Sequence, residues 1–110
     1  MSIMITKSVS VQPSLMEKCK RLIDRGEFEN FSDIVNFSMR LFLYSIRKGD
    51  IKAIEHMARR SPERTSVKVD PWVFEGLLGT GRLLESEITD YSLAYFLRWS
   101  EGTVEIDQMM

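Results

Sequence analysis

Residues 8–13 read SVSVQP, and a similar block returns fifty-eight positions later as SVKVDP over residues 66–71. A second block, SDIVNFSM over residues 32–39, returns fifty-four positions later as SEITDYSL over residues 86–93. The blocks keep their order, with four residues fewer between them in the second copy. A unit of this size cannot bury its own apolar side chains, so neighbouring copies must cover each other. We therefore expect one chain that folds like a covalently joined dimer.

Both copies of the first block alternate between apolar and polar residues, as a strand with one buried face does. In the first copy the alternation spans residues 3–12, and in the second copy it spans residues 64–70. A lone short strand is unstable and needs a partner. We therefore expect residues 5–12 to pair antiparallel with residues 64–70 of the same chain.

Behind each strand, the apolar spacing changes to that of a helix. The first copy predicts a helix over residues 13–25 that Gly26 ends, and then a long apolar helix up to residue 48 with Asn30 as its N-cap. In the second copy, Asp70 and Pro71 are suited to begin a short helix. A second long helix follows over about residues 88–99.

These elements divide the chain into two similar units. The expected divisions are residues 1–49 (first unit), 50–63 (connector helix and linker), 64–100 (second unit) and 101–110 (tail). The fold class is therefore mainly α with a short β-ribbon.

The composition excludes several classes of protein. The chain has 110 residues, of which 44% are apolar and 28% charged, and no apolar run approaches a membrane span. The N-terminus shows no signal-peptide pattern and Cys19 has no second cysteine, so we expect a cytoplasmic protein. His56 has no Cys at ligand spacing, and the glycine-rich residues 76–81 fit no nucleotide-binding motif. No catalytic set can be assembled, so we expect no enzyme activity, cofactor, metal or small-molecule substrate.

Charge is distributed unevenly between the two halves. Residues 1–60 hold eleven Lys or Arg against seven Asp or Glu, whereas residues 61–110 hold four against nine. Such asymmetry suggests an electrostatic partner for one half. The first half is the one suited to face phosphate.

The ordered elements resemble the ribbon-helix-helix superfamily, the fold of the MetJ and Arc repressors. The resemblance lies in the strand at residues 8–12, the helix behind it and NFSDI at residues 30–34, and it covers residues 5–48 and again 64–100. Tandem copies in so small a chain are most similar to transcription regulators of archaeal filamentous viruses. The resemblance implies an intramolecular pseudo-dimer that acts in the host cytoplasm if the chain is viral.

In this superfamily two paired strands enter the DNA major groove, where outward side chains contact base edges. Carried over to this sequence, the base-contacting residues are Ser8, Ser10 and Gln12 in the first copy and Arg64, Ser66 and Lys68 in the second. The same serines and Gln12 are also what the solvated face of an ordinary sheet would carry. The resemblance favours the DNA-contacting role.

Members of the superfamily also hold a DNA phosphate at the start of the second helix. The matching residues here are Asn30, Phe31 and Ser32, and we expect Lys7 to contact phosphate as well. The second copy departs from this pattern, because Leu84 replaces Asn30 and two carboxylates, Glu85 and Glu87, follow it. Asp70 likewise adds a negative charge at the end of its strand.

The resemblance therefore implies a sequence-specific regulator of transcription, a repressor or an activator, that binds double-stranded DNA. One ribbon makes few base contacts, so we also expect several chains to associate on DNA. The alternative is a protein-interaction module on the same fold, either antitoxin-like or mediating assembly.

Overall fold

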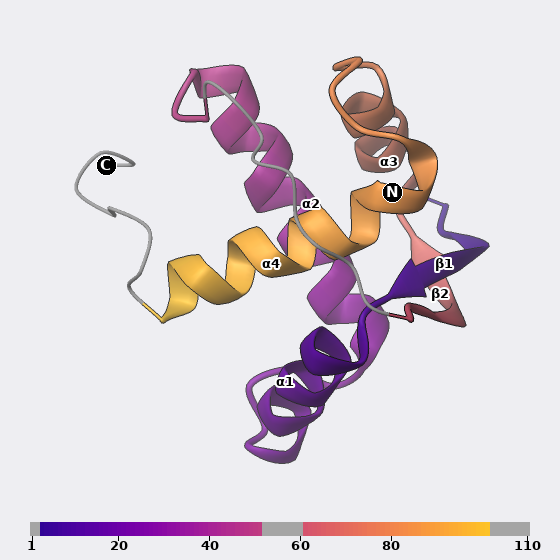
Figure 1. The fold of residues 1–110 in the computed structure, drawn as a ribbon, viewed down its shortest axis with the longest axis vertical. Coiled ribbons are helices and arrows are strands. Elements are labelled where there is room, and N and C mark those ends of the chain that lie inside the picture. The colour runs from indigo at the N-terminus through magenta and orange to yellow at the C-terminus, as the bar shows by residue number, and fades with distance from the viewer. Residues whose placement is uncertain (1–2, 52–60, 102–110) are drawn as a thin grey trace.

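The computed structural model describes residues 3–51 and 61–101 of the chain. Its elements run in the order β1 (Ile5–Val11), α1 (Pro13–Asp24), α2 (Phe31–Lys48), β2 (Glu63–Val69), α3 (Pro71–Leu78), the 3-10 helix η1 (Glu85–Glu87) and α4 (Ile88–Ser100). The sequence of strand, helix and longer helix thus occurs twice, as expected (Figure 1). Most of the connector helix expected after residue 50 and nearly all of the tail lie outside the described residues. No helix in the described part is both long and apolar enough to cross a membrane.

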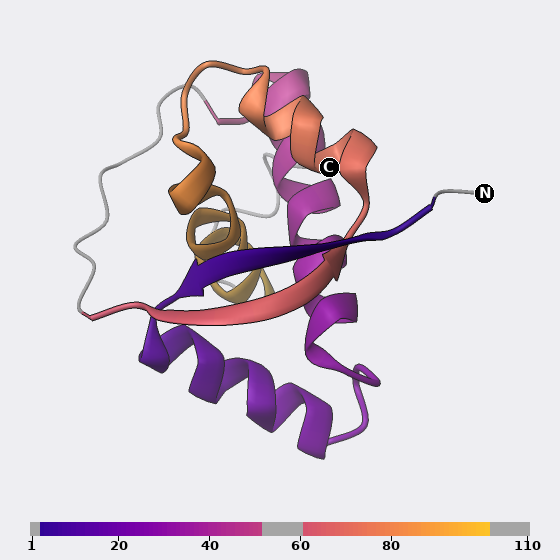
Figure 2. The same ribbon diagram turned by 90° about the vertical axis from the view of Figure 1, so that its right-hand side faces the viewer.

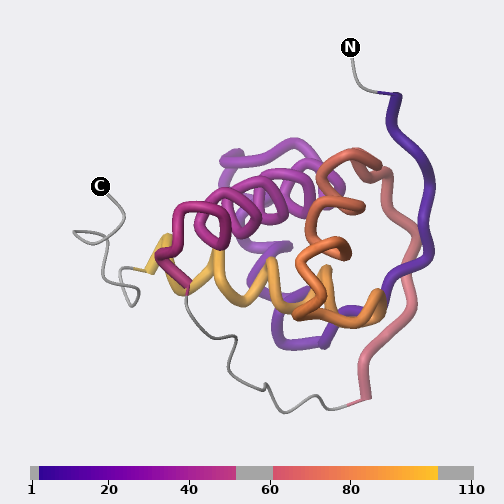
Figure 3. Tube along the Cα trace, turned by 90° about the horizontal axis from the view of Figure 1, so that it is seen from above, coloured from indigo at the N-terminus to yellow at the C-terminus, as the bar shows by residue number. Residues whose placement is uncertain are grey.

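The two strands form a two-stranded antiparallel sheet, here called the ribbon, which confirms the expected pairing within one chain. The register places Ile5 opposite Val69 and Val11 opposite Glu63, with Ser8 opposite Ser66 at the centre. The helices lie on one side of the ribbon, and its other side is open (Figure 3). One face is therefore packed and the other remains available for contacts.

The core lies between the ribbon and the two long helices. Helices α2 and α4 cross at the centre of the molecule and pack against each other (Figure 1). Helices α1 and α3 lie along opposite edges of the ribbon, both behind its packed face (Figure 2). The inward strand residues Val9, Val11, Val67 and Val69 are buried in the same core. Within the described residues, both copies contribute to this one core.

The helix starts predicted from the sequence are confirmed. The Asn30 side chain accepts a hydrogen bond from the Asp33 N–H at 2.9 Å and so caps α2. The Asp70 side chain accepts from the Trp72 N–H at 3.0 Å and caps α3, in which Pro71 is the first residue. Both caps satisfy N–H groups that have no partner within the helix.

A glycine follows the end of both α1 and α2, as predicted for Gly26 after α1. Gly26 and Gly49 have φ angles of 77° and 83°, a left-handed conformation that is unfavourable for residues with a Cβ. After α1, the Gly26 N–H donates to the Ile23 carbonyl and the Glu27 N–H to the Leu22 carbonyl, both at 3.0 Å. These bonds turn the chain sharply toward α2.

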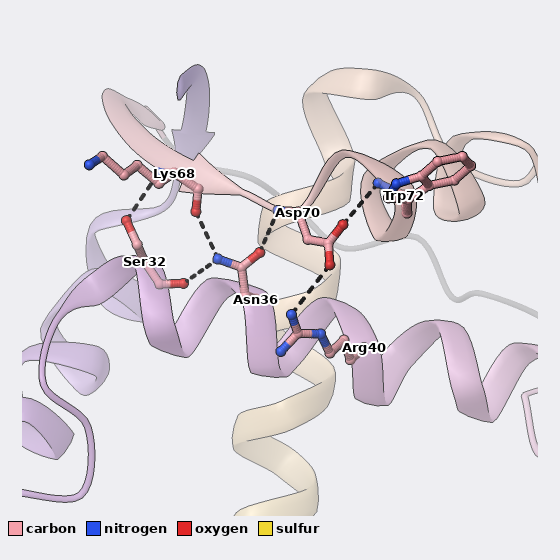
Figure 4. Close-up of polar contacts among 6 residues, drawn as sticks. All are labelled: Ser32, Asn36, Arg40, Lys68, Asp70 and Trp72. Atoms are coloured by element: carbon pink, nitrogen blue, oxygen red, sulfur yellow. Dashed lines mark hydrogen bonds and ion pairs between the residues drawn. The ribbon is translucent and has the colours of Figure 1, made fainter. Parts of the chain in front are cut away.

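Asn36 joins the end of β2 to α2 (Figure 4). This side chain is 3% exposed, and its Nδ2 donates to the Lys68 carbonyl at 2.7 Å and to the Ser32 carbonyl at 2.9 Å. Its Oδ1 accepts from the Asp70 N–H at 2.8 Å, and the Ser32 Oγ accepts from the Lys68 N–H at 3.0 Å. The outer edge of β2 is therefore bonded to α2 side chains instead of to a third strand.

Asp90 occupies the position of Asn36 in the second copy. Its Oδ1 accepts a hydrogen bond from the Gln12 N–H at 2.9 Å, and the residue is fully buried. The end of β1 is thus held to α4 as the end of β2 is held to α2. The two sites differ chemically, since the Asn36 amide both donates and accepts hydrogen bonds, whereas the Asp90 Oδ1 accepts one.

Replacing Asn36 with Asp should lower the free energy of unfolding by about 1–3 kcal/mol, because the amide that donates to two carbonyls is lost. Asn30→Asp is the matched control, since Asp caps a helix about as well as Asn does. Urea unfolding of the three proteins measures both effects. Equal midpoints for Asn36→Asp and the unsubstituted chain would contradict this account.

Candidate functional site

The open side of the ribbon carries three cross-strand pairs of polar residues, here called the ribbon face. The pairs are Thr6 with Lys68, Ser8 with Ser66, and Ser10 with Arg64. All six residues alternate with the buried valines and so lie on the other face of the ribbon. All of them except Ser10 are at least partly accessible. The ribbon face brings together five of the six residues predicted to contact bases.

Ser10 and Arg64 interact across the ribbon. The Arg64 Nη1 donates to the Ser10 Oγ at 3.2 Å, and Ser10 is only 8% exposed. The accessible side chain at this end of the ribbon is therefore the Arg64 guanidinium. The contribution of Ser10 to the ribbon face is mainly its hydrogen bond with Arg64.

Gln12 does not belong to the ribbon face, contrary to the sequence-based prediction. It follows the last residue of β1, takes the N-cap position of α1 and is 8% exposed. Thr6 takes the third outward position of β1 instead, and sequence reasoning missed it. The repeat contained the signal, because Thr6 lies fifty-eight positions before Arg64, whereas Gln12 lies fifty-eight before Asp70.

Asp70 is also turned away from the ribbon face. Its carboxylate caps α3 and lies 3.3 Å from the Arg40 Nη2 (Figure 4). The residue is buried. The negative charge expected at the end of β2 is therefore paired inside the molecule.

A hollow lies between the Lys68 end of the ribbon face and the start of α2. Its lining residues are Met4, Thr6, Asn30, Ser32, Asp33, Asn36, Ser66, Val67 and Lys68. Two of the residues predicted to bind phosphate, Asn30 and Ser32, are among them. Phe31 is not, and it packs partly buried against the core. We call Asn30, Phe31 and Ser32 the α2 start.

The chemistry of the α2 start suits an anion through its backbone. N–H groups in the first turn of a helix carry partial positive charge, and a phosphate is a natural ligand for them. The side chains of Asn30 and Ser32 already accept the Asp33 and Lys68 N–H groups. Asp33 contributes a carboxylate to the hollow, and this carboxylate repels an anion. The attraction of the hollow for anions therefore comes from the backbone N–H groups and from Lys68.

Lys7 lies apart from the ribbon face, on the packed side of β1. Its ammonium is 4.3 Å from the centre of the Phe74 ring and 3.0 Å from the Glu85 carboxylate, and its side chain is 25% exposed. The prediction that Lys7 contacts phosphate thus conflicts with its position. The ion pair joins residues seventy-eight positions apart, which no local sequence pattern could indicate.

The start of η1 and α4 differs in charge from the α2 start. The Glu87 carboxylate accepts the Leu84 N–H at 2.8 Å, and Glu85 pairs with Lys7. In the repeat, Glu85 is equivalent to Phe31 and Glu87 to Asp33, so the second helix start carries one carboxylate more than the first. An anion is therefore less favoured at the second helix start than at the first.

The described part of the chain also bears on the metal-ligating candidates. Among residues 3–51 and 61–101, no group of three His, Cys, Asp or Glu side chains is placed to hold a metal ion. His56 lies outside the described residues.

No protein-family model, curated protein or solved structure matches this chain.

Cys19 should react slowly with thiol reagents at pH 8 in the folded protein. Burial raises the pKa of its thiol to about 12, and the thiolate is the reactive form. We expect full reaction with a chromogenic disulfide in urea and little reaction over minutes in native buffer. Rapid reaction in native buffer would show that α1 opens readily.

Proposed function

We propose that this protein is a sequence-specific regulator of transcription that binds double-stranded DNA with its ribbon and has no enzymatic activity. The observation that carries the proposal is the ribbon itself. One face is packed on helices, and the other presents hydroxyl, guanidinium and ammonium groups from paired strands. This arrangement is the one expected of a ribbon-helix-helix protein.

The register of the ribbon supports a pseudo-dimer of the two copies. Ser8 pairs with Ser66, its equivalent in the repeat, so equivalent residues meet at the centre of the ribbon. Two-fold symmetry has this property, since a residue that lies on the axis meets its own equivalent. The bonds from the Asp70 N–H to Asn36 and from the Gln12 N–H to Asp90 are related in the same way.

The size and chemistry of the ribbon suit the major groove of DNA. A groove about 12 Å wide admits two strands that lie about 4.8 Å apart. Serine hydroxyls donate or accept hydrogen bonds, and Arg and Lys pair with guanine acceptors. These groups lie on one continuous face, so one docking orientation presents them all.

The hollow beside Lys68 supports contact with the sugar–phosphate backbone. A phosphate at the α2 start would receive backbone N–H groups while the neighbouring ribbon face lies in the groove. Such a contact fixes the protein on the duplex without selecting a sequence. The carboxylates of η1 provide no equivalent contact for the second copy.

Fluorescence anisotropy with a random duplex at low salt tests the proposal directly. We expect binding whose log affinity falls linearly with log salt, by about 0.9 for each phosphate contact. Absence of binding to any duplex at low salt would overturn the proposal and leave the protein-interaction module as the function of this fold.

Asn30→Asp should weaken duplex binding by about 5- to 30-fold at low salt, because it places a carboxylate beside the bound phosphate. The helix cap is retained, so unfolding by urea should be unchanged. Leu84→Asp is the matched control, since it adds the same charge at the equivalent position of the second copy. If both variants lose affinity equally, the α2 start has no special contact with phosphate.

Glu85→Gln should strengthen duplex binding by about 2- to 5-fold at low salt, since it removes a carboxylate and releases the Lys7 ammonium. The control is Glu75→Gln, which makes the same change of charge at an exposed residue of α3. Titrations at several salt concentrations compare the two. Equal affinities for the two variants would show that η1 lies away from DNA.

A further inference from the structure

Both cations of the ribbon face come from one strand. Arg64 and Lys68 lie on β2, whereas β1 contributes only hydroxyl groups, those of Thr6, Ser8 and Ser10. The residues equivalent to Arg64 and Lys68 in the repeat are Thr6 and Ser10. The two copies therefore share serine at the centre of the ribbon and differ at both flanking positions.

The backbone of Lys68 is fixed on both sides. Its N–H donates to the Ser32 Oγ at 3.0 Å, and its carbonyl accepts from the Asn36 Nδ2 at 2.7 Å (Figure 4). Its side chain is exposed at the edge of the hollow that contains the α2 start. Lys68 thus projects from a rigid position next to the expected phosphate contact.

Arg64 is oriented by a different partner at the opposite end of the ribbon. Its Nη1 donates to the Ser10 Oγ across the strand pair. A guanidinium has five N–H donors in a planar fork, so this bond leaves donors for a second acceptor. Ser10 therefore restricts where those remaining donors point.

We propose that Lys68 and Arg64 each contact one guanine, that Ser10 positions Arg64, and that the chain binds its DNA site in a single orientation. The proposal rests on the function proposed above and specifies its target. The α2 start then contacts the backbone on the flank nearest the guanine of Lys68. The predicted site is non-palindromic even though the ribbon is built from two equivalent strands.

The spacing of the two guanines follows from strand geometry. Lys68 lies four positions after Arg64, which is about 13 Å at about 3.3 Å per residue. With about 3.4 Å between base pairs, this distance corresponds to about three to four base pairs. Ser8 and Ser66 lie between the two cations and tolerate several bases, because a hydroxyl both donates and accepts.

Guanine is the expected base at both ends. In the major groove it offers two acceptors, N7 and O6, and Lys and Arg carry only donors. Adenine presents a donor beside its N7, which opposes a second cationic donor. The discrimination expected from one such contact is about 5- to 150-fold.

Selection of bound sequences from a random duplex pool tests the two contacts. The unsubstituted chain should select two guanines about three to four base pairs apart. Arg64→Ala should abolish the preference at one of them only, and Lys68→Ala at the other only, with about 5- to 150-fold less discrimination at that position. Lys20→Ala, which removes an exposed cation of α1, is the matched control and should leave both preferences intact.

Ser10 is tested by the same selection. Ser10→Ala should weaken the base preference only at the position that Arg64→Ala affects. Ser10→Thr keeps the hydroxyl and should therefore retain the preference of the unsubstituted chain at that position. A purely structural role for Ser10 would lower affinity for every duplex and leave base preference unchanged. That result would remove Ser10 from the proposal.

Orientation is tested with an iron–EDTA label on a single introduced cysteine, since Cys19 is buried and its raised pKa is expected to slow its labelling. Glu29→Cys places the label beside the α2 start, and Ser86→Cys places it on η1. Each label should cleave the selected site on one flank only, the two on opposite flanks, with the Glu29→Cys label next to the guanine of Lys68. Cleavage on both flanks by either label would overturn the single orientation.

The outcomes separate this inference from the proposed function. If the unsubstituted chain binds no duplex, the proposed function fails. If it selects a sequence but Arg64→Ala and Lys68→Ala leave that selection unchanged, DNA binding stands and the two guanine contacts are overturned.

Discussion

The antiparallel pairing of β1 with β2 is the constraint on which the rest of the structure depends. Each copy supplies one seven-residue strand, and neither strand has a partner within its own copy. Pairing them brings the helices of both copies to one side, where α2 and α4 form a shared core. A register shift of one residue would turn the buried valines outward and the ribbon face inward. Core packing therefore also determines which side chains remain exposed.

Hydrogen bonds at the two ends of the ribbon hold this register. Asn36 bonds the end of β2, and Asp90 bonds the end of β1. These side chains serve the strand edges that a larger sheet would pair with further strands. The same solution is built with an amide in one copy and a carboxylate in the other. The presence of both strands in one chain allows this difference, because a homodimer must use the same residue at both ends.

Local patterns in the sequence predicted most of the fold. Alternating residues indicated both strands, and Asn30, Asp70 and Gly26 marked helix ends because capping depends on near neighbours. The antiparallel pairing was also predicted, since each strand needs a partner and the chain offers one. These features follow from residue type and spacing alone.

The errors in the candidate site arose where tertiary contacts decide the outcome. The alternation of β1 continues through Gln12 in the sequence, but the chain turns into α1 there and buries the residue. The partner of Lys7 lies in η1, far along the chain. Conversely, the repeat would have identified Thr6, because Thr6 is the position equivalent to Arg64. The position of a residue in the repeat therefore indicates its face of the ribbon better than the alternation of a single strand does.

The location of both strands in a single chain has a consequence for the protein at low abundance. A ribbon built from two separate chains exists only while they are associated, so its stability falls with protein concentration. Here β1 and β2 find each other within one molecule, and dilution does not separate them. Each newly made chain can therefore fold without waiting for a second, even where only a few copies are present in a cell.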